Sequence, residues 1–178
     1  MDEISFARVE KDGGNFRAFA EMWLRYMREI EDEGDDEALL RRAGRLLEIH
    51  ERRKAEGKIF DIELCEYDGR AAGFCAFDVV EMKGLKNDDY IATIGPLTGS
   101  DRWGEIMEFY VRPEYRARGL AKAMFFRAME IFRRNGLERI VLTPFRDVKE
   151  FWLKLGFRDS GAMDPTNASP IFLMDARP

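Results

Sequence analysis

The sequence predicts one α/β (α+β) domain over residues 1–178, in which helices pack on a sheet. A length of 178 residues and a hydrophobic content of 46% suit a single sizeable core. Residues 59–80 have the pattern of a β-hairpin, and residues 106–143 have that of a strand, a helix and a second strand. Amphipathic helices in the first half supply a layer that covers the sheet.

The first half begins with a predicted strand at residues 4–9, and two amphipathic helices follow it. Apolar residues of the first helix recur at three- and four-residue spacing from Phe16 to Ile30. The second helix starts near Asp36 and stops at Gly57. Between them, residues 28–37 are acidic, which suits either a solvated loop or the attraction of a cationic substrate.

The hairpin gives the clearest strand signal. Its Asp-Gly pair at residues 68–69 is typical of a two-residue turn with positive φ. Pairing around this turn places Ile62 opposite Cys75 and makes one face wholly apolar. Cys65 and Cys75 then lie on opposite faces, which disfavours a disulfide and predicts two reduced thiols in an intracellular protein.

Residues 83–102 contain several glycines and a proline, so we expect an irregular segment with one short strand at residues 90–94. An insertion of this length is a candidate for shaping a substrate site. The next amphipathic pattern predicts a helix over residues 118–135, and residues 140–143 predict a strand that returns near-parallel to the strand before the helix.

A short helix follows, for which Asp147 and Glu150 have the spacing of a capping box and Gly156 is the stop signal. Phe157 begins another predicted strand, and residues 170–174 form the last one. The single histidine, His50, lies in a polar stretch and is predicted to be on the surface.

Residues 106–121 run from an apolar strand through a basic turn into a helix, and they predict a phosphate-binding segment. A helix N-terminus offers backbone N–H groups and a positive dipole end to an anion, and Gly119 permits a close approach to the main chain. Within residues 112–122, one acidic residue, Glu114, stands against four basic ones: Arg112, Arg116, Arg118 and Lys122. The predicted ligand is a nucleotide-like cofactor.

Composition excludes several other classes of function. A net charge of -5 and a pI of about 5.2 argue against a nucleic-acid-binding protein and favour amines and other cations as partners. No apolar stretch reaches the roughly 18 residues of a membrane span, and the acidic N-terminus is unlike a signal peptide, so we expect a cytoplasmic protein. With two cysteines and one histidine, neither a zinc cluster nor a serine–histidine triad is expected.

Over residues 104–160 the sequence resembles the GNAT superfamily of acyl-CoA-dependent N-acyltransferases. The motif for the CoA pyrophosphate in that family is Arg or Gln, two residues, Gly, one residue, then Gly or Ala, and it is matched by Arg116, Gly119 and Ala121. The flanking segments at residues 109–115 and 151–157 are also similar to the family pattern at the expected separations.

The resemblance implies a mixed, mostly antiparallel central sheet of about six to seven strands with about four helices on both faces. It implies acetyl-CoA as the acyl donor substrate and an amine of a small molecule or peptide as the acceptor. Backbone groups of one strand would pair with the pantetheine arm, and main-chain amides of the following turn would hold the pyrophosphate. The implied cofactor-binding residues are Phe109, Tyr110, Val111, Arg116, Ala117, Arg118, Gly119, Leu120, Ala121 and Trp152.

The implied chemistry is direct attack of a neutral amine on the thioester, which needs a base for the ammonium proton. Glu105 and Glu108 are the candidates. They point to opposite faces of a regular strand, although a bulge, which the family often has there, would reset the alternation. We favour Glu108.

The family often has a tyrosine that protonates the leaving thiolate, and Trp152 occupies that position here. The thiolate then leaves unassisted, or Tyr110 or Tyr90 assists it. A catalytically weak CoA-binding regulatory module is the alternative function, and a nucleotide-binding domain is remoter because no phosphate-binding fingerprint of that class occurs. The acceptor, the acyl chain length and the oligomeric state, a homodimer included, are left open.

Overall fold

The computed structural model describes residues 3–30, 35–83 and 89–176, and within them one sheet of seven strands. The strands are hydrogen-bonded in the order β1-β2-β3-β4-β5-β7-β6. Their bounds are Ile4–Arg8 (β1), Phe60–Tyr67 (β2), Arg70–Glu81 (β3), Arg102–Val111 (β4), Arg139–Leu142 (β5), Arg158–Met163 (β6) and Pro170–Asp175 (β7). The pairs β1–β2, β5–β7 and β6–β7 are antiparallel and β4–β5 is parallel, which confirms a mixed, mostly antiparallel sheet.

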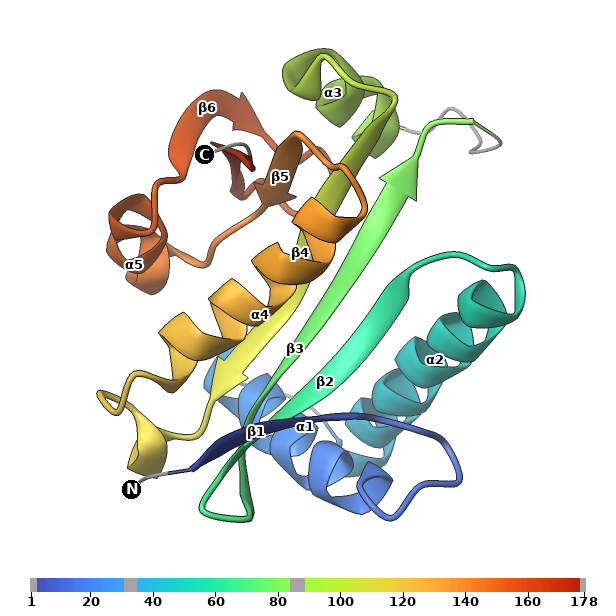
Figure 1. Cartoon of the computed structure of the whole chain (residues 1–178), viewed down its shortest axis with the longest axis vertical. Coiled ribbons are helices and arrows are strands. Elements are labelled where there is room, and N and C mark those ends of the chain that lie inside the picture. The colour runs from blue at the N-terminus through green and yellow to red at the C-terminus, as the bar shows by residue number, and fades with distance from the viewer. Residues whose placement is uncertain (1–2, 31–34, 84–88, 177–178) are drawn as a thin grey trace. The chain divides into compact units, whose positions relative to one another are not determined.

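Five α-helices accompany the sheet in the described part of the chain, one more than predicted. Their bounds are Phe16–Ile30 (α1), Asp36–Ala55 (α2), Asp89–Thr98 (α3), Leu120–Arg134 (α4) and Lys149–Lys154 (α5). Two short 3₁₀ turns, η1 (Pro113–Tyr115) and η2 (Arg146–Val148), precede α4 and α5. Figure 1 shows these elements along the chain.

The chain divides into two compact units. The first contains residues 1–77 and 108–127, and the second contains residues 78–107 and 128–178. Both β3 and β4, as well as α4, begin in one unit and end in the other. The assignment of residues 1–178 to a single domain therefore stays a prediction, and each unit is described with its own contacts.

Helices cover both faces of the sheet in the first unit. The Phe74 ring of β3 packs against Phe19, Trp23 and Tyr26 of α1, with centroid distances of 5.2, 6.1 and 5.6 Å. A Cβ on the preceding residue, Gly73, would instead lie 3.1 Å from the sulfur of Met124 in α4. Because successive strand residues point to opposite faces, α1 and α4 lie on opposite sides of β3.

The hairpin forms as predicted, and its turn residues Asp68 and Gly69 have φ values of 49° and 71°. These positive values are those of a type I′ turn, whose twist matches that of the two strands. Cys65 and Cys75 are both buried and free, so the prediction of two unpaired thiols is confirmed. In the same unit, α1 packs against α2, which lies on β2 (Figure 1).

The prediction of a surface position for His50 is wrong, because its side chain is fully buried. His50 follows Leu39, Ala43 and Leu47 at helical spacing along the inner face of α2. Its ring stacks on Phe60 at a centroid distance of 6.0 Å. The polar sequence neighbours that suggested exposure lie on the other sides of the helix.

The second unit is built on the parallel pairing of Gly104 and Glu105 of β4 with Ile140 and Val141 of β5. Its core surrounds the fully buried Trp103, together with Val80, Ile91, Ile94, Val141, Ile171 and Leu173. A Cβ on Gly104 would lie 2.8 Å from both Phe132 and Ile140, so glycine is required there for the close packing of α4.

Residues 90–94, predicted as a short strand, are part of the helix α3. The buried residues Ile91, Ile94, Gly95 and Thr98 recur at helical spacing on one face of α3. The β-branched residues and Pro96 hid this pattern, since both are typical of non-helical segments. Part of the segment, residues 84–88, lies outside the described residues.

The capping box predicted for the short helix is also wrong. Asp147 lies in η2, α5 begins at Lys149, and its N-cap Val148 makes no side-chain cap bond. The stop at Gly156 is confirmed by its φ of 101° and by hydrogen bonds from the N–H groups of Gly156 and Phe157 to Leu153 and Trp152, both 3.1 Å.

Two glycine substitutions in the first unit are expected to change stability in opposite directions. Gly73→Ala places a Cβ 2.5 Å from the carbonyl oxygen of Tyr110, a backbone atom with little freedom, and is expected to destabilise the protein by about 2 kcal/mol or more. Gly44→Ala, inside α2 with open space around its Cβ, is expected to stabilise it by about 1 kcal/mol. Urea denaturation of both variants tests this, and equal effects would contradict the packing.

Candidate functional site

The predicted phosphate-binding segment forms an exposed loop between β4 and α4. The loop leaves the strand at Val111, closes the 3₁₀ turn η1 through a hydrogen bond from the Arg116 N–H to the Pro113 oxygen (3.2 Å), and enters α4 at Leu120. Ala117 and Gly119 have positive φ values of 61° and 83°. The loop residues 116–119 are exposed, so the main chain there is accessible to a ligand.

The first turn of α4 directly follows this loop, and the first amides of a helix have no partner within it. The Ala123 N–H donates to the Gly119 oxygen at 3.0 Å as a first-turn helical bond. The N–H groups of Leu120, Ala121 and Lys122 precede it and have no partner within the helix. The first turn of α4 contains no acidic residue, so its own side chains do not offset the positive dipole end. This arrangement suits an anion such as a phosphate.

Arg116, the first residue of the predicted motif, connects the loop to two neighbouring elements. Its Nε donates to the Val111 oxygen at 2.9 Å, and its Nη2 pairs with Glu29 of α1. The guanidinium also lies over the Tyr110 ring, 5.8 Å from the centroid. Arg116 therefore ties the loop to the end of β4 and to α1.

Arg118 and Arg112, two further basic residues of the segment, also have partners. Arg118 lies over the Tyr67 ring at 5.3 Å, and its Nη1 is 3.4 Å from the hydroxyl of Tyr67. Arg112 pairs with Glu114 at 2.6 Å, and Glu114 in turn pairs with Arg25 of α1 at 3.1 Å. These contacts fix the basic side chains around the loop.

Glu108, the favoured base, lies half-buried on β4 in the first unit. Its Oε2 accepts a hydrogen bond of 2.6 Å from the hydroxyl of Tyr26. Tyr110, two residues further along, donates its hydroxyl proton to Glu29 at 2.7 Å. Burial, followed by this bond to a carboxylate, raises the pKa of Tyr110 above its usual value, so the phenol stays protonated.

Glu105 lies half-buried in the second unit, where the hydroxyl of Tyr90 from α3 donates to its Oε1 at 2.5 Å. Burial, and then the negative charge of Glu105, raise the pKa of Tyr90. Because the two glutamates lie in different units, which of them faces a substrate stays a prediction. Both tyrosines proposed as proton donors are hydrogen-bonded to carboxylates.

Trp152 has a packing role in the second unit. Its buried ring meets Phe151 and Phe157 edge to face, at centroid distances of 4.9 and 5.6 Å. It thereby joins α5 to the residue that precedes β6. Its assignment to cofactor binding stays a prediction, as do those of Phe109 and Val111, which lie half-buried and buried at the end of β4.

Neither cysteine is suited to act as a nucleophile. Burial raises the pKa of Cys65 to about 12 and raises that of Cys75 well above its usual value. A protonated thiol is a poor nucleophile, so an acyl-cysteine intermediate is disfavoured. Among the residues that the structure describes, no group of three or more histidines, cysteines or carboxylates is arranged to hold a metal ion.

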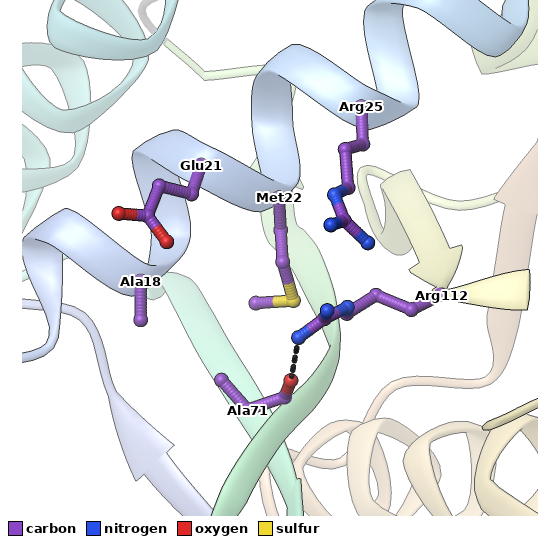
Figure 2. A pocket seen from close by; sticks show the side chains of 6 residues that line it. All are labelled: Ala18, Glu21, Met22, Arg25, Ala71 and Arg112. Carbon is purple, nitrogen blue, oxygen red and sulfur yellow. Dashed lines mark hydrogen bonds between the residues drawn. The ribbon is translucent and has the colours of Figure 1, made fainter. Parts of the chain in front are cut away.

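A separate pocket of about 110 Å³ lies beside α1 (Figure 2). Ala18, Met22 and Ala71 line it together with the charged Glu21, Arg25 and Arg112. The Arg112 guanidinium crosses the pocket and donates to the Ala71 oxygen at 3.1 Å. Residues 116–122 of the β4–α4 loop and the first turn of α4 are not part of this lining.

Sequence reasoning missed Glu29 and Tyr26, which hold the side chains of the predicted site. Glu29 was included in the acidic segment of residues 28–37, part of which (31–34) lies outside the described residues. Tyr26 is one of the buried residues of α1 and was not part of the predicted helical pattern. Both residues could be recognised only from their contacts with Glu108 and Tyr110 of β4, and these contacts are known only from the tertiary structure.

Residues 16–157 match the family model of the acetyltransferase (GNAT) family. In a sequence comparison with curated proteins, none matches significantly. Within the described residues, no helix combines the length and apolar character needed to cross a membrane.

Solved structures share the fold at low sequence identity. The PaiA N-acetyltransferase from Thermoplasma acidophilum, in complex with coenzyme A, has a TM-score of 0.69 and 16% identity over 97% of this chain and 99% of its own. A GCN5-related N-acetyltransferase from Ralstonia eutropha has a TM-score of 0.65 and 19% identity, over 90% of this chain and 96% of its own. FeeM, an N-acyl amino acid synthase from uncultured soil microbes, has a TM-score of 0.64 and 14% identity, over 98% of this chain and 91% of its own.

The two positive-φ residues of the loop are expected to respond oppositely to exchange of glycine and alanine. Gly119→Ala adds a Cβ in open space but strains a φ of 83°, and is expected to cost about 1 kcal/mol of stability. Ala117→Gly relieves such strain at 61° and is expected to gain up to about 1 kcal/mol. Thermal and urea unfolding measure both, and loss of stability in Ala117→Gly would contradict the loop conformation.

Proposed function

The chain belongs to the acetyltransferase (GNAT) family, and from this premise we propose that it transfers an acetyl group from acetyl-CoA to a primary amine. By family it is an acyl-CoA-dependent N-acyltransferase. We further propose that the acceptor is an amine of a small molecule or a peptide. The acidic composition of the chain supports this proposal, because it favours cationic partners.

The observation that carries the proposal is the exposed β4–α4 loop that leads directly into the first turn of α4. Its fit to a pyrophosphate can be judged at Gly119, where no heavy atom lies within 4 Å of an added Cβ. A ligand atom can therefore approach the main chain closely at this point. Arg116 and the α4 dipole supply positive charge nearby. The complex of PaiA with coenzyme A supports this choice of donor.

Residues 116–121 would hold the pyrophosphate through their main chain, and the backbone of residues 109–111 would lie along the pantetheine arm. The bound acetyl-CoA supplies an activated thioester. Glu108 takes the ammonium proton of the acceptor, directly or through water, and Tyr26 keeps the carboxylate in place through its 2.6 Å hydrogen bond. Because both thiols are held protonated, the acyl group passes directly to the amine.

Departure of the thiolate is the least assisted step. The indole N–H of Trp152 is too weak an acid to protonate a thiolate, and the hydroxyl of Tyr110 donates to Glu29. This observation favours the second candidate function, a catalytically weak CoA-binding regulatory module. The two functions differ in one measurable respect, since the module binds acetyl-CoA without turning it over. The free, buried cysteines support a cytoplasmic location for either.

Glu108→Gln is expected to lower kcat/KM for acetyl transfer by about 10²-fold or more, because an amide cannot accept the ammonium proton. The measurement is release of the CoA thiol with a panel of primary amines, and binding of acetyl-CoA should change less than twofold. Glu105→Gln is the matched control, since it is also a half-buried glutamate of β4 bound by a tyrosine hydroxyl.

The outcomes separate the hypotheses. A large loss in Glu105→Gln and none in Glu108→Gln would assign the base to Glu105. Binding of acetyl-CoA with no transfer to any amine by the unmodified protein would favour the regulatory module. If the unmodified protein does not bind acetyl-CoA, the assignment of the donor is wrong.

A further inference from the structure

Glu29 occupies a position that α1 itself does not favour. It lies one residue before the end of the helix at Ile30. A carboxylate in the last turn of a helix faces the negative end of the dipole, which is unfavourable. Partners outside the helix can offset this unfavourable interaction.

Two such partners come from the β4–α4 region. The hydroxyl of Tyr110 donates to Glu29 Oε1 at 2.7 Å, and the Nη2 of Arg116 pairs with Oε2. One carboxylate thus binds both a residue of β4 and the first residue of the phosphate-binding motif.

The ion pair is accessible to solvent and therefore exchangeable. The Arg116 side chain is 51% exposed and that of Glu29 is 37% exposed. An exposed pair of this kind is held weakly, and another anion that reaches the guanidinium competes with the carboxylate for it. The Nε of Arg116 stays on the Val111 oxygen, so exchange at Nη2 does not require the loop to leave the strand.

We propose that Glu29 is the resident counter-ion of Arg116, which the phosphates of the donor displace when they bind at the loop. This inference rests on the proposed function, since it takes acetyl-CoA as the ligand. Before binding, Glu29 neutralises Arg116 and keeps the basic loop ordered. During binding, the phosphates must break its ion pair and approach its negative charge. Glu29 is thus a positioning residue that lowers donor affinity.

The test is calorimetric titration of CoA into the full chain with Glu29→Gln, which removes the charge but keeps the size and a hydrogen-bond acceptor for Tyr110. We expect CoA to bind about threefold to tenfold more tightly at low salt, with the gain shrinking as salt screens the charges. Glu21→Gln is the matched control, because Glu21 is another α1 carboxylate paired with an arginine, Arg17, by an i,i+4 contact. It is expected to leave CoA affinity unchanged.

Two further titrations identify the atoms involved. In an Arg116→Gln background, Glu29→Gln is expected to lose most of its gain, because the guanidinium for which the anions compete is absent. With acetylated pantetheine, which has no pyrophosphate, Glu29→Gln is expected to have no effect. A merely structural role would change binding of both ligands alike and would not depend on Arg116.

The inference is overturned if Glu29→Gln weakens CoA binding, leaves it unchanged, or tightens it equally without Arg116. In these cases CoA still binds to the unmodified protein, and the proposed function stands. If the unmodified protein binds neither CoA nor inorganic pyrophosphate, the proposed function and the inference both fail. Circular dichroism of each variant separates loss of binding from loss of folding.

Discussion

The proposed site depends on a loop that would have to keep its backbone N–H groups open to an anion and still remain folded without one. Two positive-φ residues and the start of α4 expose these groups, which by themselves contribute no stability. The loop is stabilised by the Arg116 side chain, which binds the Val111 oxygen and Glu29. The motif arginine thus acts first as part of the scaffold.

The carboxylates of the first unit follow from this arrangement. The chain has a net charge of -5, yet the acidic residues near the loop are each bound by a named partner: Glu29 by Tyr110 and Arg116, Glu114 by Arg25 and Arg112, and Glu108 by Tyr26. Aromatic rings of α1, β3 and β4 pack between these groups. The apolar contacts position the tyrosine hydroxyls that bind the carboxylates. Hydrogen bonds and ion pairs to these carboxylates would reduce their repulsion of the phosphates of the proposed ligand.

Local patterns predicted the parts of the molecule that local physics determines. The Asp-Gly turn of the hairpin, the stop at Gly156 and the strand, helix and strand around residue 119 depend on neighbours in sequence, and they were confirmed. The failures have tertiary causes. His50 has polar sequence neighbours, but its position on the inner face of α2 buries it. The segment of α3 contains β-branched residues, yet one face of it packs against Trp103 as a helix. The role of Glu29 could not be predicted, since its partners lie more than 80 residues away.

The central claim is that backbone amides of the β4–α4 loop and of the first turn of α4 receive the donor pyrophosphate. Amide chemical shifts in a ¹H–¹⁵N NMR titration with acetyl-CoA test it most directly. The largest shift changes are expected at residues 117–122. Changes concentrated instead around the pocket of Ala18, Ala71 and Arg112, with the amides of residues 117–122 unaffected, would contradict it.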